Sequence, residues 1–553
     1  MSDLVTVGAV QLEAVHGEVR TNLAAIEELA AAAAADGARL VVTPEMALTG
    51  YLWPDEESVR GLAEPVDGPS VRRLAGLCRT IGAWLVLGLP ELDPDLGTLH
   101  NSCVLIGPDG PVGSYRKTQP FVADPRWAVD GHLRPPVWDT PAGRVSPLIC
   151  ADVDHPEPMR YAALSGADWV ALPTAWVDEP GPSATWRLRA WENGLPMVAA
   201  DMAGAEPLDG ATVQFSGGTC VLDHSGNVTA ALDGGTGYVT ATLDLAEAAA
   251  VRRARLKARR PAEYRPLARS STWPRSDHEA LSDRPTRTEP VVGAVFSGPP
   301  GVPPAAPEGT RLAVLPAFHL TGGRPDPEQD AAARRVLWDW CAAGRCEAVT
   351  ALAVRDEDGR PRYAVVHCTP EGRMAVRYAT HLGAQAAWAA PGAEPPRPVQ
   401  RPWGTLGLLA AEELEAFEPS RVLAVLGADV IAAPGAVDWP FPVPFAGTRV
   451  PLEPALLREP DSEFAHPARL RAGDSHVWIA MANAGRVPGG LFSPDHVTVP
   501  RTEAVADGPG WTVLDCPLVG REGPGVVCAA KPQLARRRTD LYGAAMLRGP
   551  RRV

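Results

Sequence analysis

The sequence lacks a long apolar run, since none of its 553 residues belongs to an uncharged apolar stretch of about 18 residues. This absence excludes a membrane-spanning helix. Met1-Ser-Asp-Leu4 leads into a strand-like segment with no basic region before it, so we expect a protein that is not exported. The chain also has no excess of positive charge. Its formal net charge of −14 argues against nucleic acid as the main partner.

Cysteine pairs at metal-binding spacing are missing as well. None of the nine cysteines forms a Cys-x-x-Cys pair, and their spacing matches no zinc module. We therefore expect free thiols, a reducing cytoplasm and no metal site. A chain of 553 residues is too long for one hydrophobic core, so we expect two or more domains.

Strand-like and helical segments alternate through the first 245 residues. A β-rich run at 5–10 precedes a helical segment at 22–35, and strands at 169–172 and 197–200 flank a helical segment at 184–193. This alternation predicts a layered α/β domain. The composition changes over residues 250–290, where a basic cluster gives way to Pro, Ser and charges. We interpret that segment as a tail and linker.

The second half of the chain is a diverged copy of the first. Gly404-Thr-Leu-Gly-Leu-Leu-Ala-Ala411 has the pattern of Gly143-Arg-Val-Ser-Pro-Leu-Ile-Cys150, and positions 404, 411 and 427 follow 143, 150 and 166 by the same 261 residues. Arg469-Leu-Arg-Ala472 likewise repeats Arg187-Leu-Arg-Ala190. The repeat predicts a domain at 1–250, a tail and linker at 251–290 and a second domain at 291–553.

The copy serves as an internal control for function. Pro44, Leu48, Thr49 and Gly50 persist in Leu315-Pro-Ala-Phe-His-Leu-Thr-Gly322 and therefore belong to the fold. Three reactive side chains do not persist, because alanines 317, 379 and 411 stand opposite Glu45, Lys117 and Cys150. Taken singly, each could be structural, and a strand-end cysteine is more often a core residue. The loss of all three together indicates a unit that carries chemistry.

The chemistry of the three is coherent. A cysteine supplies a nucleophile that attacks best as a thiolate. A carboxylate such as Glu45 can take the thiol proton, pass it to a leaving amine and then activate water. The Lys117 ammonium can stabilise an oxyanion together with the N–H of Ala151.

These residues lie in segments that resemble the motifs of the nitrilase superfamily of carbon–nitrogen hydrolases. The segments are Pro44-Glu-Met-Ala-Leu-Thr-Gly-Tyr51, Tyr115-Arg-Lys-Thr118, Cys150-Ala-Asp-Val-Asp-His-Pro-Glu157 and Arg189-Ala-Trp-Glu-Asn-Gly194, and the resemblance covers roughly residues 4–267. It implies a four-layer αββα sandwich, a Glu45–Lys117–Cys150 triad, a thioester intermediate and no metal or organic cofactor. Because family members pair their sandwiches, it also implies two such sandwiches packed within this chain as a pseudo-dimer, the second without a triad. Formation of a homo-oligomer is left open.

Further residues are candidates for binding substrate. Asp124 is the nearest match to a second glutamate that many family members carry, and Asp154 stands where hydrolases of acidic or carbamoyl amino acids often have arginine. Tyr51 and Trp176 are further candidates, and Trp127 could equally wall the pocket or belong to the core. With Asp178 and Glu179 near the expected mouth, the acids favour a neutral or cationic substrate, although exposed loop acids are an equally good interpretation.

The resulting hypothesis is a cytoplasmic amidase or N-carbamoyl amine hydrolase that acts on a small aliphatic amide. An acyltransferase, in which an amine resolves the acyl-enzyme, would have the same triad. Hydrolysis of an organic nitrile is a further alternative, and a non-enzymatic scaffold suits only the second half. The sequence itself does not identify the substrate.

Overall fold

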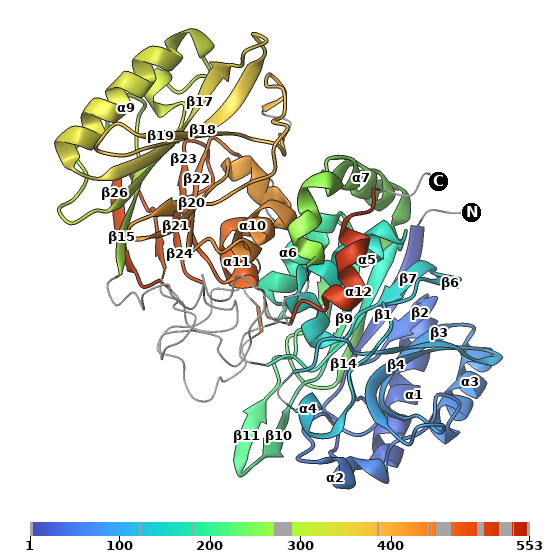
Figure 1. The fold of residues 1–553 in the computed structure, drawn as a ribbon. Coiled ribbons are helices and arrows are strands. Elements are labelled where there is room, and N and C mark those ends of the chain that lie inside the picture. Colours follow the sequence, from blue (N-terminus) through green and yellow to red (C-terminus); the bar gives the residue numbers. More distant parts are fainter. Residues whose placement is uncertain are drawn as a thin grey trace.

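Two pairs of β-sheets, one pair in each half of the chain, dominate the structure (Figure 1). The structure is a computed structural model. It describes residues 4–121, 123–177, 181–269, 290–383, 386–439, 466–494, 503–518 and 536–549, together with 442, 443, 445, 447, 448 and 534.

The first half contains two six-stranded mixed sheets. In spatial order the first sheet consists of β14 (Gly237–Asp244), β1 (Leu4–Gln11), β2 (Leu40–Val42), β3 (Trp84–Leu92), β4 (Leu99–Gly107) and β5 (Gly110–Arg116). The second consists of β13 (Val228–Ala231), β12 (Cys220–Leu222), β9 (Met197–Asp201), β8 (Trp169–Thr174), β7 (Gly143–Pro147) and β6 (Trp138–Thr140). A small hairpin, β10 (Ala205–Leu208) and β11 (Ala211–Gln214), projects from this half (Figure 1).

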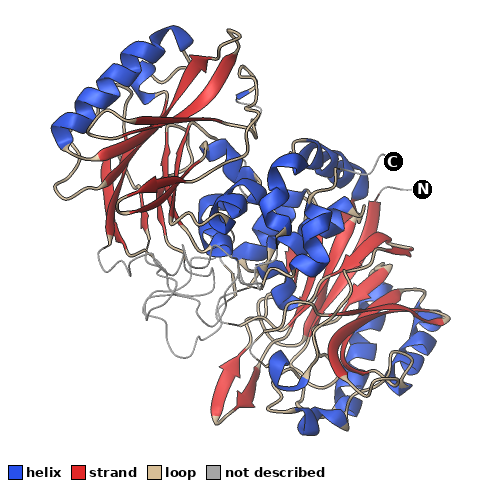
Figure 2. Cartoon of the chain, viewed as in Figure 1, coloured by secondary structure: helices blue, strands red, loops and turns tan. Residues whose placement is uncertain are grey.

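Helices cover the outer faces of these sheets (Figure 2). The helices of the first half are α1 (Val19–Ala35), α2 (Glu56–Arg60), α3 (Pro69–Ile81), α4 (Asp124–Trp127), α5 (Pro156–Leu164), α6 (Ala184–Asn193) and α7 (Leu245–Lys257), with the 3-10 helices η1 (Cys150–Asp154) and η2 (Pro261–Ala268). Local sequence sets the bounds of α6: the Ser183 side chain accepts a hydrogen bond from the Thr185 N–H at its start, and Gly194, at φ +58°, ends it. The helix predicted at 184–193 is confirmed.

The second half repeats the strand order of the first. Its first sheet consists of β26 (Gly510–Cys516), β15 (Val291–Ser297), β16 (Leu312–Ala317), β17 (Glu347–Arg355), β18 (Pro361–Cys368) and β19 (Met374–Tyr378). Its second sheet consists of β25 (Ala504–Val505), β24 (Gly490–Phe492), β23 (Trp478–Asn483), β22 (Val430–Gly435), β21 (Gly404–Leu408) and β20 (Val399–Arg401). The prediction of two similar α/β sandwiches is confirmed.

The helical layer of the second half is thinner. Its helices are α9 (Asp330–Gly344), α10 (Phe417–Val425), α11 (Pro467–Ser475) and α12 (Thr539–Met546), with the short 3-10 helices η3 (His319–Thr321), η4 (Pro327–Gln329) and η6 (Ala411–Glu415). The counterpart of α1 is missing, because the described residues 298–311 between β15 and β16 contain no helix. Only α9 therefore covers the outer face of this sheet in the described part of the second half (Figure 1).

The hydrophobic cores lie between the paired sheets. In the first half, side chains of β1, β2 and β3 such as Val7 and Val86 meet those of β8 and β9, such as Leu172 and Val198. The same layer recurs in the second half around β16, β17 and β22. Because both faces of these sheets are covered, their central strands are continuous apolar runs rather than alternating ones.

The two halves meet through α5 and α6 of the first and α10 and α11 of the second, which lie between the sheet pairs (Figure 2). The contacts are reciprocal. Glu157 pairs with Arg421 at 3.1 Å, and Arg160 pairs with Glu418 at 3.7 Å, which are the same two positions exchanged between the halves. Reciprocity of this kind is the signature of a two-fold interface. These reciprocal ion pairs are in keeping with the predicted intrachain pseudo-dimer, which stays a prediction.

The basic segment after residue 250 is not an extended linker. Its arginines lie in or just after helix α7, and Arg255 pairs with Glu415 at 2.7 Å while Arg259 pairs with Glu418 at 2.8 Å. The composition indicated a tail and linker because these acceptors lie far away in the sequence, in the second half. Residues 270–289 lie outside the described part of the chain.

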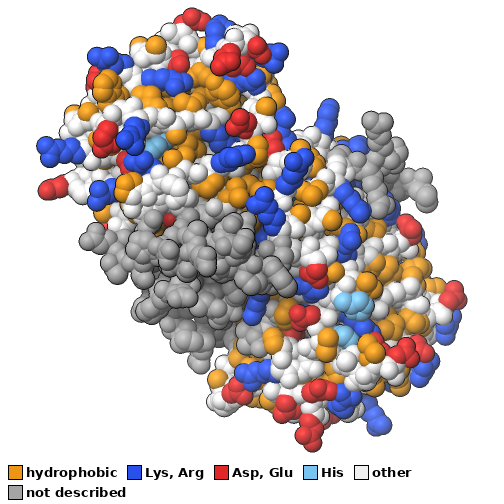
Figure 3. All heavy atoms as spheres, in the orientation of Figure 1, with side chains coloured by type: hydrophobic (Ala, Val, Ile, Leu, Met, Phe, Trp, Pro, Cys, Tyr) orange, Lys and Arg blue, Asp and Glu red, His pale blue; other side chains and the backbone are white. Residues whose placement is uncertain are grey.

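Charged side chains of both signs are interspersed over the face drawn in Figure 3. Among the described residues, no helix has the length and apolar character needed to cross a membrane.

Candidate active site

Glu45 lies at the carboxyl end of β2, completely buried. Its Oε1 accepts hydrogen bonds from Asn101 Nδ2 and Lys117 Nζ, both at 2.7 Å, and its Oε2 accepts one from the Ala175 N–H at 3.0 Å. Gly88 permits this arrangement, because a Cβ there would lie 2.1 Å from the Pro44 carbonyl oxygen. The carboxylate is thus fixed on both oxygens.

Lys117 follows β5 and points at two carboxylates. Its Nζ lies 2.7 Å from Glu45 Oε1 and 2.7 Å from Asp124 Oδ2, and it stands over the Tyr51 ring at 5.4 Å from the ring centroid. Burial alone would lower the pKa of this ammonium, but the charges of Asp124 and Glu45 raise that pKa well above its usual value. Lys117 therefore stays charged.

Cys150 is the first residue of η1 and has a φ of +43°. A non-glycine residue in this region is strained, and such strain is typical of nucleophiles held on a sharp turn after a strand. Burial raises the pKa of the thiol well above its usual value and Glu45 raises it further, while Lys117, the Thr174 hydroxyl and the Ala175 N–H lower it. The protonated thiol is therefore favoured over the thiolate.

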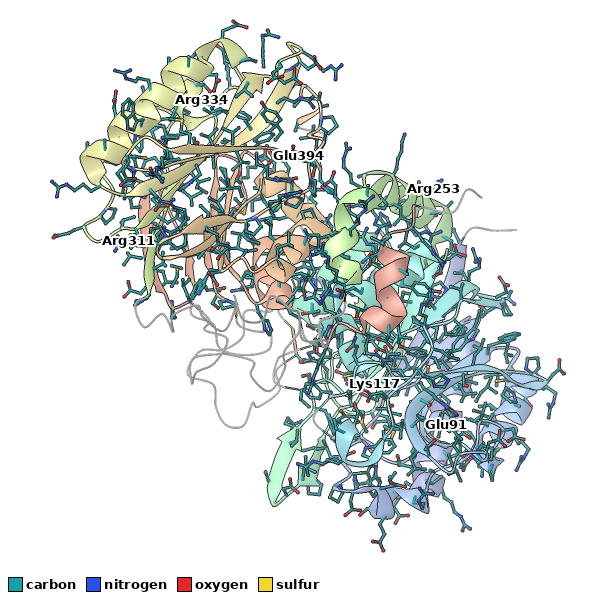
Figure 4. All side chains as sticks on the ribbon, viewed as in Figure 1. Glu91, Lys117, Arg253, Arg311, Arg334 and Glu394 are labelled. Carbon is teal, nitrogen blue, oxygen red and sulfur yellow. The ribbon has the colours of Figure 1, made fainter. Side chains whose placement is uncertain are left out.

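A neutral thiol needs a base, and Glu45 is suited to that role. Burial raises the pKa of the Glu45 carboxyl; Lys117 lowers it and Asp124 raises it. A carboxylate with a raised pKa accepts a proton more readily than an ordinary one. The three predicted catalytic residues are brought together in one buried cluster, within which Lys117 can be followed in Figure 4.

Asp124 lies inside this cluster, on α4, and not at a mouth. Its Oδ2 contacts Lys117 and accepts the Phe121 N–H at 2.8 Å, and its Oδ1 accepts Asn101 Nδ2 at 2.8 Å. Asp124 shares Lys117 with Glu45 and is buried, so it is not the mouth acid that was expected. The preference for a neutral or cationic substrate stays a prediction. The other two acids of that interpretation, at 178 and 179, lie outside the described residues.

The remaining predicted binding residues surround the cluster at different distances. The Tyr51 hydroxyl donates a long hydrogen bond of 3.4 Å to Asp124 Oδ2. Ala151 follows Cys150 in η1, whereas Asp154 ends that helix, buried, with its carbonyl accepting from Arg189. Trp176 is buried against Trp186 with ring centroids 5.3 Å apart. A role of Ala151, Asp154 or Trp176 in binding substrate stays a prediction.

Sequence reasoning missed two residues that build the site. Asn101 on β4 bridges Glu45 and Asp124, and its tyrosine counterpart in the copy could have revealed it. Asp152 joins the two catalytic loops: Oδ1 accepts the N–H groups of Thr118 and Gln119 at 3.3 and 3.1 Å, and Oδ2 accepts that of Ile149 at 2.9 Å. Buried Trp127 forms part of the apolar cluster beside Tyr51.

The matching region of the second half is closed by aromatic side chains. Tyr363 stands opposite Asn101, since its carbonyl accepts the N–H of Ala379 at 2.8 Å just as that of Asn101 accepts the N–H of Lys117 at 2.8 Å. Its ring packs on Phe318 and Trp388, with centroids 5.2 and 5.9 Å apart. The three alanines lie buried in this region, and Ala411 lacks the positive φ of Cys150.

The first half of the chain is similar to known carbon–nitrogen hydrolases. The carbon–nitrogen hydrolase family matches residues 6–253. A nitrilase of Pyrococcus abyssi is 36% identical over 204 residues, which are 37% of this chain and 77% of that protein. A citrullinase of Francisella tularensis is 30% identical over 262 residues, covering 44% and 90% of the two chains. Among solved structures, an amidase from Nesterenkonia is 30% identical over 46% of this chain and 95% of its own, with a TM-score of 0.39.

The family match spans β1 to α7 and therefore includes Glu45, Lys117 and Cys150. The chain belongs to the carbon–nitrogen hydrolase family of the nitrilase superfamily and is a hydrolase of carbon–nitrogen bonds other than peptide bonds.

Proposed function

We propose that the protein is a thiol-dependent amidase or N-carbamoyl amine hydrolase acting on a small aliphatic amide, with Glu45, Lys117 and Cys150 as its catalytic residues. One observation carries the proposal: a buried Glu45–Lys117 pair, 2.7 Å apart, lies beside a cysteine at positive φ. Residues 1–250 would carry the reaction and residues 291–553 would carry none, because all three positions are alanine there.

In the first step Glu45 takes the thiol proton as the sulfur attacks the carbonyl carbon. A C–S bond forms and the carbonyl electron pair moves to oxygen, where Lys117 Nζ and the Ala151 N–H donate hydrogen bonds to it. Glu45 then passes its proton to the substrate nitrogen. The C–N bond breaks, ammonia or an amine leaves, and a thioester remains on Cys150.

In the second step water resolves the thioester. Glu45, ionised again, removes a proton from the attacking water, and the tetrahedral oxyanion uses the same two donors. The C–S bond breaks, the acid product leaves, and the proton on Glu45 returns to the sulfur. Lys117 stays protonated throughout, in keeping with its raised pKa.

Relatives support the class of substrate but not its identity. Formamidases of Bacillus cereus are 30% identical over 200 residues, and their name favours an amide. The name citrullinase supports a carbamoyl amine as an alternative substrate, and the name nitrilase supports a nitrile. Lys117 already has two carboxylate partners, which leaves no further cation in the described cluster for an anionic substrate and so favours a neutral one. Among neutral substrates we place the amide first because of the formamidase relatives.

Incubation with a panel of small amides, carbamoyl amines and nitriles tests the proposal, with ammonia release and intact mass as readouts. We expect an acyl adduct on Cys150, and we expect Cys150→Ala to lose both adduct and turnover. Cys78→Ala, at a buried cysteine of α3, is the matched control and should keep both. Turnover that survives in Cys150→Ala would refute the proposal.

An amine acceptor is distinguished by its product. If added primary amines divert the acyl group into a new amide at the expense of free acid, the enzyme is an acyltransferase that shares the thioester step. If the acid yield does not change as amine is added, water is the acceptor and hydrolysis is supported.

A further inference from the structure

The C-terminal helix of the second half touches the loop that carries Lys117. Tyr542 of α12 is buried, and its hydroxyl lies 3.0 Å from Thr118 Oγ1. Arg538, just before α12, donates from Nη1 to the carbonyl oxygens of Thr118 and Gly131 at 3.2 and 2.9 Å. Helix α12 therefore rests on the first half although it ends the second (Figures 1 and 4).

Thr118 links α12 to the turn that carries Cys150. Its hydroxyl donates to Asp152 Oδ1 at 3.0 Å, so the single hydroxyl hydrogen is used and Tyr542 is the donor in the bond between them. Asp152 Oδ2 in turn accepts the Ile149 N–H, directly before Cys150. An unbroken chain of hydrogen bonds thus runs from α12 to Ile149, the residue before the nucleophile.

A second route reaches the same turn through a buried arginine. Arg189 Nε donates to the Val153 carbonyl oxygen at 2.8 Å, and its Nη2 donates to that of Asp154 at 3.1 Å, both in η1. Asp474 of α11 holds this guanidinium with both carboxylate oxygens, at 2.5 and 3.0 Å. The second half therefore supplies a counter-charge for the group that anchors the Cys150 turn.

The first half makes the reciprocal contacts on a region without chemistry. Tyr264 of η2 reaches across, and its hydroxyl lies 2.6 Å from His381 Nε2, beside the alanine that stands opposite Lys117. Arg471 Nε donates to the Leu414 carbonyl oxygen in η6 at 3.1 Å, and Arg471 pairs with Glu192. The architecture thus contains its own control, with equivalent contacts on a catalytic and on a silent turn.

We propose that the second half is a built-in positioning subunit, in which Tyr542, Arg538 and Asp474 hold the Lys117 loop and the Cys150 turn in register for catalysis. The inference rests on the proposed roles of Lys117 and Cys150. These three residues touch no reacting atom, so they act through Thr118 and Arg189.

The test compares Tyr542→Phe with Tyr264→Phe in the full chain, since each removes one buried hydroxyl at matching places. We expect similar shifts of the thermal unfolding midpoint. Tyr542→Phe should slow iodoacetamide alkylation of Cys150, followed by intact mass, and lower kcat by roughly fivefold, the equivalent of one hydrogen bond. Tyr264→Phe should leave both rates within about twofold of the original, so equal rate effects of the two variants would overturn the proposal.

Substitutions of Asp474 give a second, independent test. Asp474→Asn should slow Cys150 alkylation and kcat by about tenfold, because the anchored guanidinium loses the bidentate one of its two counter-charges and keeps only Glu192, at 3.0 Å. Asp474→Glu should restore both, since the reciprocal position already carries a glutamate, Glu192. Unchanged rates in Asp474→Asn contradict the positioning role. If Cys150 in the original protein reacts no faster than it does after Lys117→Ala, the proposed triad fails instead.

Discussion

The two halves of this chain share a framework and differ at the three positions of the proposed triad. Both arrange twelve strands in the same order, and both use an acid in the turn after the second sheet's inner strand to hold the neighbouring loop. Asp152 accepts the N–H groups of Ile149 and Thr118, and Glu413 accepts those of Ala410 and Thr380 in the same way. The acid at this position, Asp152 or Glu413, therefore belongs to the shared fold, whereas the proposed triad does not.

The silent half, residues 291–553, also shows which side chains take the place of the proposed triad. Phe318, Tyr363 and Trp388 occupy its counterpart region, and Phe318 keeps the positive φ of Met46 at 57° against 54°. The turn after β16 is thus retained while the charged cluster is replaced by packed rings. Burying rings gains free energy that a buried, paired charge cluster does not give. The comparison predicts that the active half sacrifices stability for its site.

The largest effect is expected from Lys117→Ala, which copies the silent half at one position only. Glu45 and Asp124 would then face each other with only Asn101 between them, so one carboxyl must bind a proton. We expect activity to fall at least about 1,000-fold. The free energy of unfolding, measured by urea titration at pH 8, should fall by roughly 3–5 kcal/mol.

The double variant Glu45→Ala with Lys117→Ala sharpens this test. It copies the silent half at both positions and removes one of the stranded carboxylates. Stability should recover partly, while activity stays lost, and a double-mutant cycle gives the coupling energy. A single Lys117→Ala variant as stable as the original protein would show that the ion pair is not what distinguishes the halves.

Glu45 should set the acid limb of the pH–rate profile. Burial raises the pKa of this carboxyl, and a base must be ionised in the free enzyme. We therefore expect kcat/KM to rise with pH through a pKa above the ordinary glutamate value of about 4.3. Glu45→Gln should lower kcat/KM by about 100- to 10,000-fold and remove the limb.

Glu263→Gln is the matched control for the pH profile. Burial raises the pKa of this carboxyl too, but it lies in η2, away from the triad. The acid limb should be unchanged in this variant. A limb that moves with Glu263 and not with Glu45 would assign the base elsewhere.

Glu412 stands opposite Ala151 and should make the silent half sensitive to pH. Burial raises the pKa of this carboxyl to about 7, although a hydrogen bond from the Tyr363 hydroxyl at 3.2 Å acts to lower it. Between pH 4.5 and 7 the folded state keeps a proton that the unfolded chain releases, so stability falls as pH rises through this window. The loss should reach about 3 kcal/mol, and Glu412→Gln should abolish it. Equal slopes for both proteins in urea titrations at several pH values would contradict this assignment.

Much of the fold and the triad could be predicted because both leave local or repeated signals. Strand and helix periods gave the α/β class, and the offset copy isolated Glu45, Lys117 and Cys150 as a unit. The structure brings these three together in one buried cluster.

The long-range partners could not be predicted. Arg255 looked like part of a basic tail and linker because its acceptor, Glu415, is 160 residues away. Asp124 looked like a mouth acid because no local pattern shows that Lys117 and Asn101 reach it. A single sequence records which residues are reactive, but buried pairing between distant segments has no periodicity that would reveal it.

The smallest expected effect concerns backbone strain at position 150. Cys150 has a φ of +43°, a conformation that glycine adopts without cost, whereas Ala411 has no positive φ. Cys150→Gly should therefore be more stable than Cys150→Ala by about 1 kcal/mol, measured as the free energy of unfolding. At the silent turn the sign should reverse, with Ala411→Gly destabilising by roughly 0.5–1 kcal/mol through added freedom of the unfolded chain. If glycine destabilises both turns alike, the strain at Cys150 is not a property that separates the two halves.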